Sequence, residues 1–198
     1  MIFSVLEELR FKDVFSDLSL FSGDEEIDYI DVLIEHSTRT STFVYDSEVE
    51  GHSIFIEDTS GIGNNKIFII KNPNRKDFFL MHIDGVLFDK NSKCDCAIIT
   101  DKELDFIEFK SNAINRTDEA IESNYEKASS QLLNTLTEFR RRYEAIGDSL
   151  DGKKKLECYA VFNKTVPRNP AYQKKLSASF LKNSNGVKLK FENSKIIR

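Results

Sequence analysis

The sequence lacks tryptophan and has only three prolines and eight glycines among its 198 residues. Such low proline and glycine contents exclude collagen-like and low-complexity chains, and an apolar content of 40% excludes a largely disordered one. No apolar run reaches the roughly 20 residues of a membrane-spanning helix. Glu7 and Glu8 interrupt the first apolar residues where a signal peptide would continue, so we expect a cytoplasmic protein with no membrane partner.

Residues for several common kinds of active site are also missing. The three cysteines are Cys94, Cys96 and Cys158. They form no Cys-x-x-Cys pair, which argues against a disulfide framework and a four-cysteine zinc site. The histidines form no His-Glu-x-x-His group, and no Gly-x-Ser-x-Gly motif is present. Gly61 and Gly63 lack the later Lys-Ser/Thr of a phosphate-binding loop, so we expect a hairpin turn there.

Charge is divided unevenly along the chain. The net charge is −5, but residues 1–110 hold 23 acids and 11 bases, whereas residues 111–198 hold 10 acids and 17 bases. The basic second half is typical of a phosphate-binding surface and equally of a lysine-rich solubilising surface. Arg140, Arg141 and Arg142 also fit compensation of a helix dipole at a C-terminus. Charge alone therefore does not decide the function.

Alternating and continuous apolar patterns predict several strands. Residues 53–56 and 66–70 are expected to pair around the turn at residues 61–65. Residues 78–83, 94–100 and 104–110 are short apolar runs separated by turn residues. They predict three consecutive strands arranged as a meander.

After residue 110 the apolar period changes to that of a helix. Apolar residues recur at steps of three and four between Asp118 and Ile146, with Thr117 as the N-cap and Gly147 as the stop. The apolar run at residues 156–162 then predicts a buried, parallel strand. A helix at residues 171–181 completes the expected α/β fold, together with a strand at residues 187–191 that lies at an edge or has a single buried face.

Asp95, Glu108 and Lys110 are the candidate catalytic residues. Glu108 and Lys110 lie two apart on one predicted strand, so their side chains share a face while Phe109 enters the opposite one. Hairpin pairing can bring Asp95 toward Glu108, and Cys94 and Cys96, which flank Asp95, are expected to face away from it. Two close carboxylates suit Mg²⁺ or Mn²⁺, and Lys110 can neutralise charge on a phosphate. The alternative is that these residues form a surface ion-pair cluster on a hairpin, without a catalytic role.

At these residues the chain resembles the PD-(D/E)XK nuclease superfamily. The resemblance runs from about Phe78 to Phe162 and implies a restriction-endonuclease-like αβββαβ core, with a mixed central sheet flanked by helices. It implies that Asp95 and Glu108 bind Mg²⁺ or Mn²⁺ through their side chains and Phe109 through its carbonyl. Lys110 would be catalytic, and Gln131 would position substrate or water, as in the exonuclease-like branch of the superfamily.

Two positions depart from the family pattern. Cys94 stands where proline usually precedes the aspartate. The acid expected from the first helix has four candidates that the sequence leaves open: Glu35, Glu48, Glu50 and Glu57. Asp84 is an additional acid at the end of the first strand. The chain is also similar to small bacterial proteins suspected of roles in defence against foreign DNA. The residues that carry this likeness are Asp84-Gly85, Asp95, Glu108 to Lys110 and Gln131 to Thr135.

The length of the chain predicts one domain over residues 1–198. N-terminal additions (1–75) would precede the nuclease-like core (about 76–165), and a C-terminal helix and strand (166–198) would follow. The expected function is a metal-dependent nuclease that hydrolyses DNA rather than RNA, with a homodimer or a partner protein as a further expectation. The alternatives are an inactive nuclease-like module that binds nucleic acid or a protein, and an interaction protein whose acidic half recruits a basic partner.

Overall fold

The computed structural model describes residues 7–16, 33–60, 62, 67–88, 93–110, 117–163 and 166–198. Three helices are described, namely α2 (Phe11–Val14), α4 (Asp118–Ala145) and α5 (Pro170–Asn183). The strands are β1 (Ile34–Ser37), β2 (Ser41–Asp46), β3 (Ser53–Ile56), β4 (Ile67–Lys71), β5 (Phe78–His82), β6 (Cys96–Ile99), β7 (Glu103–Lys110), β8 (Lys155–Phe162), β9 (Lys188–Lys190) and β10 (Ser194–Ile196). The chain is therefore a mixed α/β protein, as the sequence predicted. No helix in this part of the chain is long and apolar enough to cross a membrane.

The larger sheet has six strands in the order β1-β5-β6-β7-β8-β9. Strands β5, β6 and β7 pair antiparallel in succession, which confirms the predicted meander. β8 pairs parallel to β7 along its whole length, and β9 lies at the edge beside β8. The parallel strand and the edge strand predicted from the sequence are both confirmed. α4 makes the connection from β7 to β8.

The smaller sheet has four strands in the order β10-β4-β2-β3. β3 and β4 correspond to the two strands predicted in the N-terminal region, but they do not pair with each other. β2 lies between them and pairs antiparallel with both, so the predicted hairpin is wrong. Most of its expected turn, residues 61–65, lies outside the described residues. β2 was not predicted, although its central residues, Thr-Phe-Val-Tyr at 42–45, have high strand propensity.

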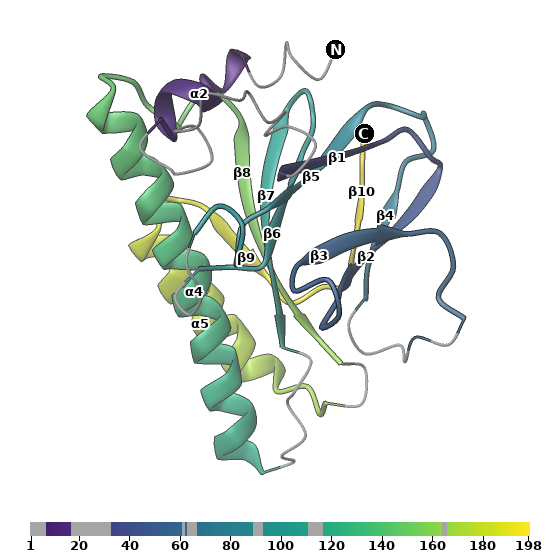
Figure 1. Ribbon diagram of the computed structural model, residues 1–198. Helices are drawn as coiled ribbons and strands as arrows, with labels where there is room; N and C mark the ends of the chain where they lie inside the picture. The colour runs from purple at the N-terminus through teal and green to yellow at the C-terminus, as the bar shows by residue number, and fades with distance from the viewer. Residues whose placement is uncertain are drawn as a thin grey trace.

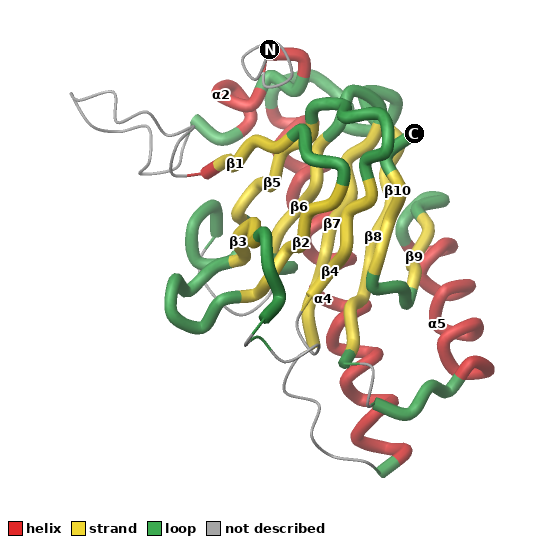
Figure 2. The backbone as a smooth tube through the Cα atoms, turned by 90° about the vertical axis from the view of Figure 1, so that its right-hand side faces the viewer, coloured by secondary structure: helices red, strands yellow, loops and turns green. Residues whose placement is uncertain are grey.

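The two sheets and the helices form layers (Figure 1). α4 and α5 lie along one face of the larger sheet, and strands β2, β3, β4 and β10 lie at its other face. Figure 2 shows the strands side by side with α4 behind them. One buried apolar cluster lies on the helix side of the larger sheet, and a second lies between the two sheets. Among the described residues, a second sheet thus covers the face on which a flanking helix was expected.

The long helix α4 forms where the sequence predicted it, for the predicted reasons. The Thr117 hydroxyl caps its start by accepting the Ala120 N–H at 3.3 Å. Its buried side chains recur at helical spacing and include Tyr125, Leu132 and Phe139. The helix ends before Gly147, which has a φ of 69° that favours glycine. α4 therefore presents one apolar face to β7 and β8.

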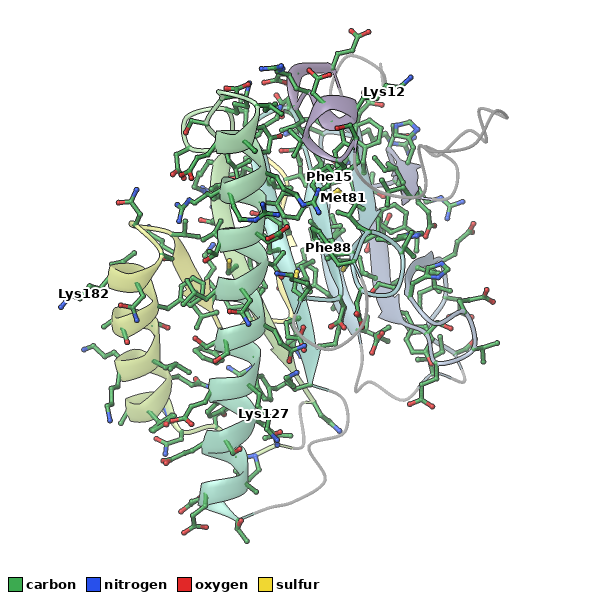
Figure 3. All side chains as sticks on the ribbon, turned by 60° about the vertical axis from the view of Figure 1, so that its left-hand side comes forward. Lys12, Phe15, Met81, Phe88, Lys127 and Lys182 are labelled. Carbon is green, nitrogen blue, oxygen red and sulfur yellow. The ribbon has the colours of Figure 1, made fainter. Side chains whose placement is uncertain are left out.

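The three arginines near the end of α4 are used within the fold. Arg141 and Arg142 both bond Glu138, and Arg140 bonds Asp151 at 2.7 Å. The guanidinium of Arg142 also lies over the rings of Phe15 and Phe88, at 5.2 and 5.3 Å from their centroids. Figure 3 shows Phe15, Met81 and Phe88 beside α4, whereas Lys182 on α5 points outward.

Candidate functional site

Asp95 directly precedes β6 and lies at a β-bulge. Its N–H donates to the Ile107 carbonyl at 3.1 Å, although Cys96 is already the register partner of Ile107. At the end of the ladder, Asp95 and Cys96 thus oppose one residue of β7, the arrangement found in a bulge. On the other side, the Asp95 carbonyl accepts the N–H groups of Ile83 and Asp84 at 3.1 and 3.2 Å. Bonds to both neighbouring strands therefore fix the backbone of Asp95.

The bulge changes the faces of the flanking cysteines. Cys96 packs in the cluster between the sheets, whereas Cys94 packs in the cluster on the helix side. The expectation that both cysteines share a face is wrong, because the extra residue in the bulge reverses the alternation of the strand. Bulges re-aim side chains and are frequent beside active sites.

The Asp95 carboxylate turns toward β7. Its Oδ2 accepts the backbone N–H of Phe109 at 2.5 Å. In an antiparallel pair, a residue directs its N–H and its C=O toward the same neighbouring strand. The Phe109 carbonyl therefore faces the Asp95 side of β7 as well. This places a carboxylate and a backbone carbonyl on one edge of the strand.

Glu108 and Lys110 face α4 from the end of β7, and Phe109 packs between the sheets. The Lys110 ammonium donates to Glu108 Oε1 and to Gln131 Oε1. Gln131 Nε2 in turn donates to the Lys93 carbonyl at 3.1 Å. The fold thus brings together all the candidate residues, from the start of β6, the end of β7 and the middle of α4. The Glu108 side chain is 2% exposed and that of Lys110 is 17% exposed.

Burial and like charge both act on the two carboxyls. Burial raises the pKa of Asp95 well above its usual value, and the charges of Glu108 and Asp46 add to this effect. Burial also raises the pKa of Glu108 to about 7, although Lys110 opposes the rise, and Asp84 and Asp46 contribute to it. Both carboxylates are therefore costly to ionise where they stand, and a nearby cation would stabilise their charged forms.

Glu108 provides the test of whether a divalent cation fits here. Its Oε2 is buried and has no hydrogen-bond partner among the described residues, whereas Oε1 bonds Lys110. A buried carboxylate oxygen without a donor is destabilising unless it meets a cation. In the part of the chain that the structure describes, no three His, Cys, Asp or Glu side chains are grouped to hold a metal. Two carboxylates and a carbonyl nevertheless suit Mg²⁺, which keeps several waters.

The acid expected from a first helix is not found among its candidates. Glu35 lies on β1, where it bonds His82 Nε2 at 3.1 Å, and Glu57 pairs with Arg39. The other two candidates lie in the turn after β2. None of the four candidates is therefore on a helix, because this region of the chain forms strands and turns.

Sequence reasoning missed one acid that acts on the site. Asp46 ends β2 in the smaller sheet, and its charge raises the pKa of both Asp95 and Glu108. No local pattern could have found Asp46, because only the packing of one sheet on the other brings it near. Asp84, which the sequence did single out, contributes its charge to Glu108 from the chain after β5.

A cavity of about 570 Å³ lies at the opposite end of β7, near Glu103. Its charged groups largely pair with one another: Lys155 bonds Glu103 and Glu157, and Lys190 bonds Glu157. Lys195 in its wall reaches the buried Asp105 of β7 and ties β10 to the larger sheet. This network links the two sheets and is separate from the candidate site.

Comparisons of the chain with protein-family models, curated proteins and solved structures found no match.

Proposed function

We propose that the chain is a metal-dependent nuclease of the PD-(D/E)XK type, with a core formed by β5, β6, β7, α4 and β8. The observation that carries the proposal is the buried Glu108 carboxylate, which has one oxygen on Lys110 and the other without a donor in the described structure. The order of the elements, βββαβ, agrees with the resemblance seen in the sequence. The coincidence of topology and side chains supports the proposal more strongly than either does alone.

The proposed metal ligands are the carboxylates of Asp95 and Glu108 and the carbonyl of Phe109. A bound Mg²⁺ or Mn²⁺ would polarise a phosphodiester and lower the pKa of an attacking water. The bulge holds Asp95 in place for this role, and the Phe109 N–H keeps its Oδ2 at the edge of β7. The site is thus built on the backbone of two paired strands, which gives a more rigid geometry than a loop.

Lys110 and Gln131 are the proposed catalytic partners of the ligands. The Lys110 ammonium is positioned to neutralise the negative charge that develops on a phosphate, or to hold the attacking water. The Gln131 amide orients Lys110 through its Oε1 while its Nε2 is held by the Lys93 carbonyl. Gln131 therefore fixes the ammonium relative to β6, and it lies close enough to the same site to contact substrate or water.

We propose DNA as the substrate, in preference to RNA. The support is the basic second half of the chain and the likeness of the sequence to small proteins suspected of acting against foreign DNA. The three arginines of α4 are paired within the fold, so the phosphate contacts would come from lysines such as Lys93 and Lys127 near the site. Lys127 lies on α4 one turn before Gln131 (Figure 3).

The proposal is tested by cleavage assays on plasmid, linear DNA and RNA in Mg²⁺ or Mn²⁺. Glu108→Ala and Lys110→Ala should each lower the rate by at least about 100-fold, because each removes an electrostatic group from the reacting centre. The matched controls are Glu50→Ala and Lys102→Ala, which alter the same residue types at exposed positions elsewhere. Cleavage that persists in both site variants would show that another site or a contaminant is responsible.

A second candidate function is a non-catalytic module that binds nucleic acid or a partner protein. It is favoured by the bonds of the Lys110 ammonium to Glu108 Oε1 and Gln131 Oε1, which hold the ammonium in place without a metal. This module would bind DNA with an affinity that falls steeply with salt, and it would not turn over. Binding without cleavage at any concentration of Mg²⁺ or Mn²⁺ would distinguish it from the nuclease.

A further inference from the structure

The chain immediately before Asp95 lies outside the sheet. The N–H of Cys94 donates to the Thr135 hydroxyl at 2.7 Å, and the Lys93 carbonyl accepts Gln131 Nε2 at 3.1 Å. Both backbone groups are thus bonded by side chains of α4. Gln131 and Thr135 are four residues apart and lie on one face of that helix.

Thr135 bonds two separate segments of the chain through one hydroxyl. Its Oγ1 accepts the Cys94 N–H and donates to the Gln131 carbonyl at 2.9 Å. The residue is fully buried, and its branched side chain restricts rotation about χ1. The hydroxyl is therefore held in one orientation. Its proton points to the Gln131 carbonyl, and a lone pair points to the Cys94 N–H.

These two contacts decide what the Phe109 N–H can bond. If residues 93 and 94 continued along β7 beyond the bulge, their backbone would take the place beside Phe109. Because α4 holds them away, the edge of β7 at Phe109 is left to the Asp95 carboxylate, which accepts its N–H at 2.5 Å. The position of the Asp95 carboxylate thus depends on the α4 contacts as well as on the bulge.

We propose that Thr135 is a positioning residue of the candidate metal site. It acts through the Cys94 N–H to hold Asp95 at the edge of β7, so the inference rests on the proposed nuclease function. Thr135 touches neither the candidate ligands nor Lys110 in any of its hydrogen bonds described here. Its role is therefore distinct from that of Gln131, which bonds Lys110 itself.

A positioning role and a packing role require different parts of the side chain. Packing between α4 and β6 needs a branched side chain of this size, which valine supplies equally well. Positioning needs the hydroxyl, which serine keeps and valine lacks. Thr137 provides the matched control: it lies on the same helix, and its hydroxyl donates to the Leu133 carbonyl at 2.8 Å, but it is exposed.

The experiment compares Mn²⁺ binding by the full chain and three variants, followed by the Mn²⁺ electron paramagnetic resonance signal. Thr135→Val should raise the Kd for Mn²⁺ by about tenfold or more, as loss of groups that orient metal ligands does elsewhere. Thr135→Ser and Thr137→Val should bind like the unaltered chain. The Mn²⁺ concentration that gives half-maximal DNA cleavage should likewise rise in Thr135→Val and stay unchanged in Thr135→Ser and Thr137→Val. At saturating Mn²⁺, the kcat of Thr135→Val should change less than its Kd for Mn²⁺.

A readout that needs no metal accompanies these measurements. The short bond to Asp95 should move the Phe109 amide proton downfield in NMR spectra, and Thr135→Val should reverse that shift while Thr137→Val should not. Thr135→Ala gives a second variant without the hydroxyl if the valine variant does not fold.

The outcomes separate this inference from the proposed function. Unchanged Mn²⁺ affinity and an unchanged Phe109 shift in folded Thr135→Val or Thr135→Ala would overturn the positioning role alone. Equal losses in Thr135→Ser and Thr135→Val would also overturn it, because the methyl group would then be responsible. An unaltered chain that neither binds Mn²⁺ nor cleaves DNA would refute the nuclease proposal and this inference with it.

Discussion

Replacing Glu108 with glutamine should make the metal-free protein more stable while removing its proposed activity. Glu108 is 2% exposed at its side chain, and burial raises its pKa to about 7 even though Lys110 is bonded to it. Ionised Glu108 therefore lowers the free energy of unfolding of the metal-free protein. Glutamine has nearly the same shape and carries no charge to desolvate, so the variant avoids this cost.

The magnitude and the pH range follow from the pKa of the folded and unfolded states. A rise from 4.5 to about 7, at about 1.4 kcal/mol per unit, corresponds to roughly 3 kcal/mol. Because the folded state holds its proton to higher pH, the free energy of unfolding falls as the pH rises from about 4.5 to about 7, and it stays low above that range. Glu108→Gln should therefore exceed the unaltered chain by about 3 kcal/mol at pH 8 and match it near pH 4.

Glu157 on the neighbouring strand β8 is the matched control, with the opposite sign. Burial opposes its ionisation, but Lys190, Lys155 and the Tyr159 hydroxyl outweigh burial and lower its pKa to about 2. Its contribution to stability is present above about pH 4.5 and is lost as the pH falls toward 2. Glu157→Gln should therefore lower the free energy of unfolding at pH 8 by up to about 3 kcal/mol.

Urea denaturation in EDTA at pH 4, 6 and 8, followed by circular dichroism, measures these differences. The reasoning would be refuted if Glu108→Gln were no more stable than the unaltered chain at pH 8, or if its advantage were the same at all three pH values. A constant advantage would indicate better packing rather than relief of a buried charge.

Three other predictions concern the metal, the ammonium and the joint between the sheets. Mg²⁺ at 100 times its Kd should raise the free energy of unfolding by about 2.7 kcal/mol, and Asp95→Asn should abolish this gain in thermal unfolding assays; an equal gain in the variant would contradict the ligand assignment. Lys110→Met should retain Mn²⁺ binding by calorimetry but lose at least about 100-fold in kcat; loss of both would mean that Lys110 mainly supports the fold. Lys195→Met should cost about 3 to 5 kcal/mol in urea denaturation, because it leaves the buried Asp105 carboxyl without its partner, and adding Asp105→Leu should restore most of the loss.

The elements that the sequence predicted well are those whose pattern is set by one neighbouring layer. α4 shows its apolar stripe because one face packs on the larger sheet, and its cap and its terminal Gly147 are local signals. β8 appears as a continuous apolar run because it is buried on both faces. In both cases the local sequence and the tertiary environment favour the same structure.

The elements that the sequence missed depend on contacts between distant segments. β3 and β4 were recognised, but their pairing was not, because β2 enters between them from earlier in the chain. The bulge at Asp95 was missed because it depends on how three strands pair, so the orientation of Cys94 was predicted incorrectly.

The candidate site shows the same division. The strand alternation predicted that Glu108 and Lys110 share a face, and the structure places both toward α4. Asp46 had no signal in the sequence, since its effect on Glu108 comes through space from the smaller sheet. The contacts of Thr135 were equally hidden, because the Cys94 N–H comes from a segment 41 residues earlier in the chain.

The central claim is that Asp95, Glu108 and the Phe109 carbonyl together bind a divalent cation. Anomalous diffraction from a crystal soaked in Mn²⁺ tests it most directly. We predict one strong anomalous peak within ligand distance of both carboxylates and of the Phe109 carbonyl, and no such peak in a crystal of Glu108→Gln. Saturating Mn²⁺ that leaves this position without a peak would contradict the claim.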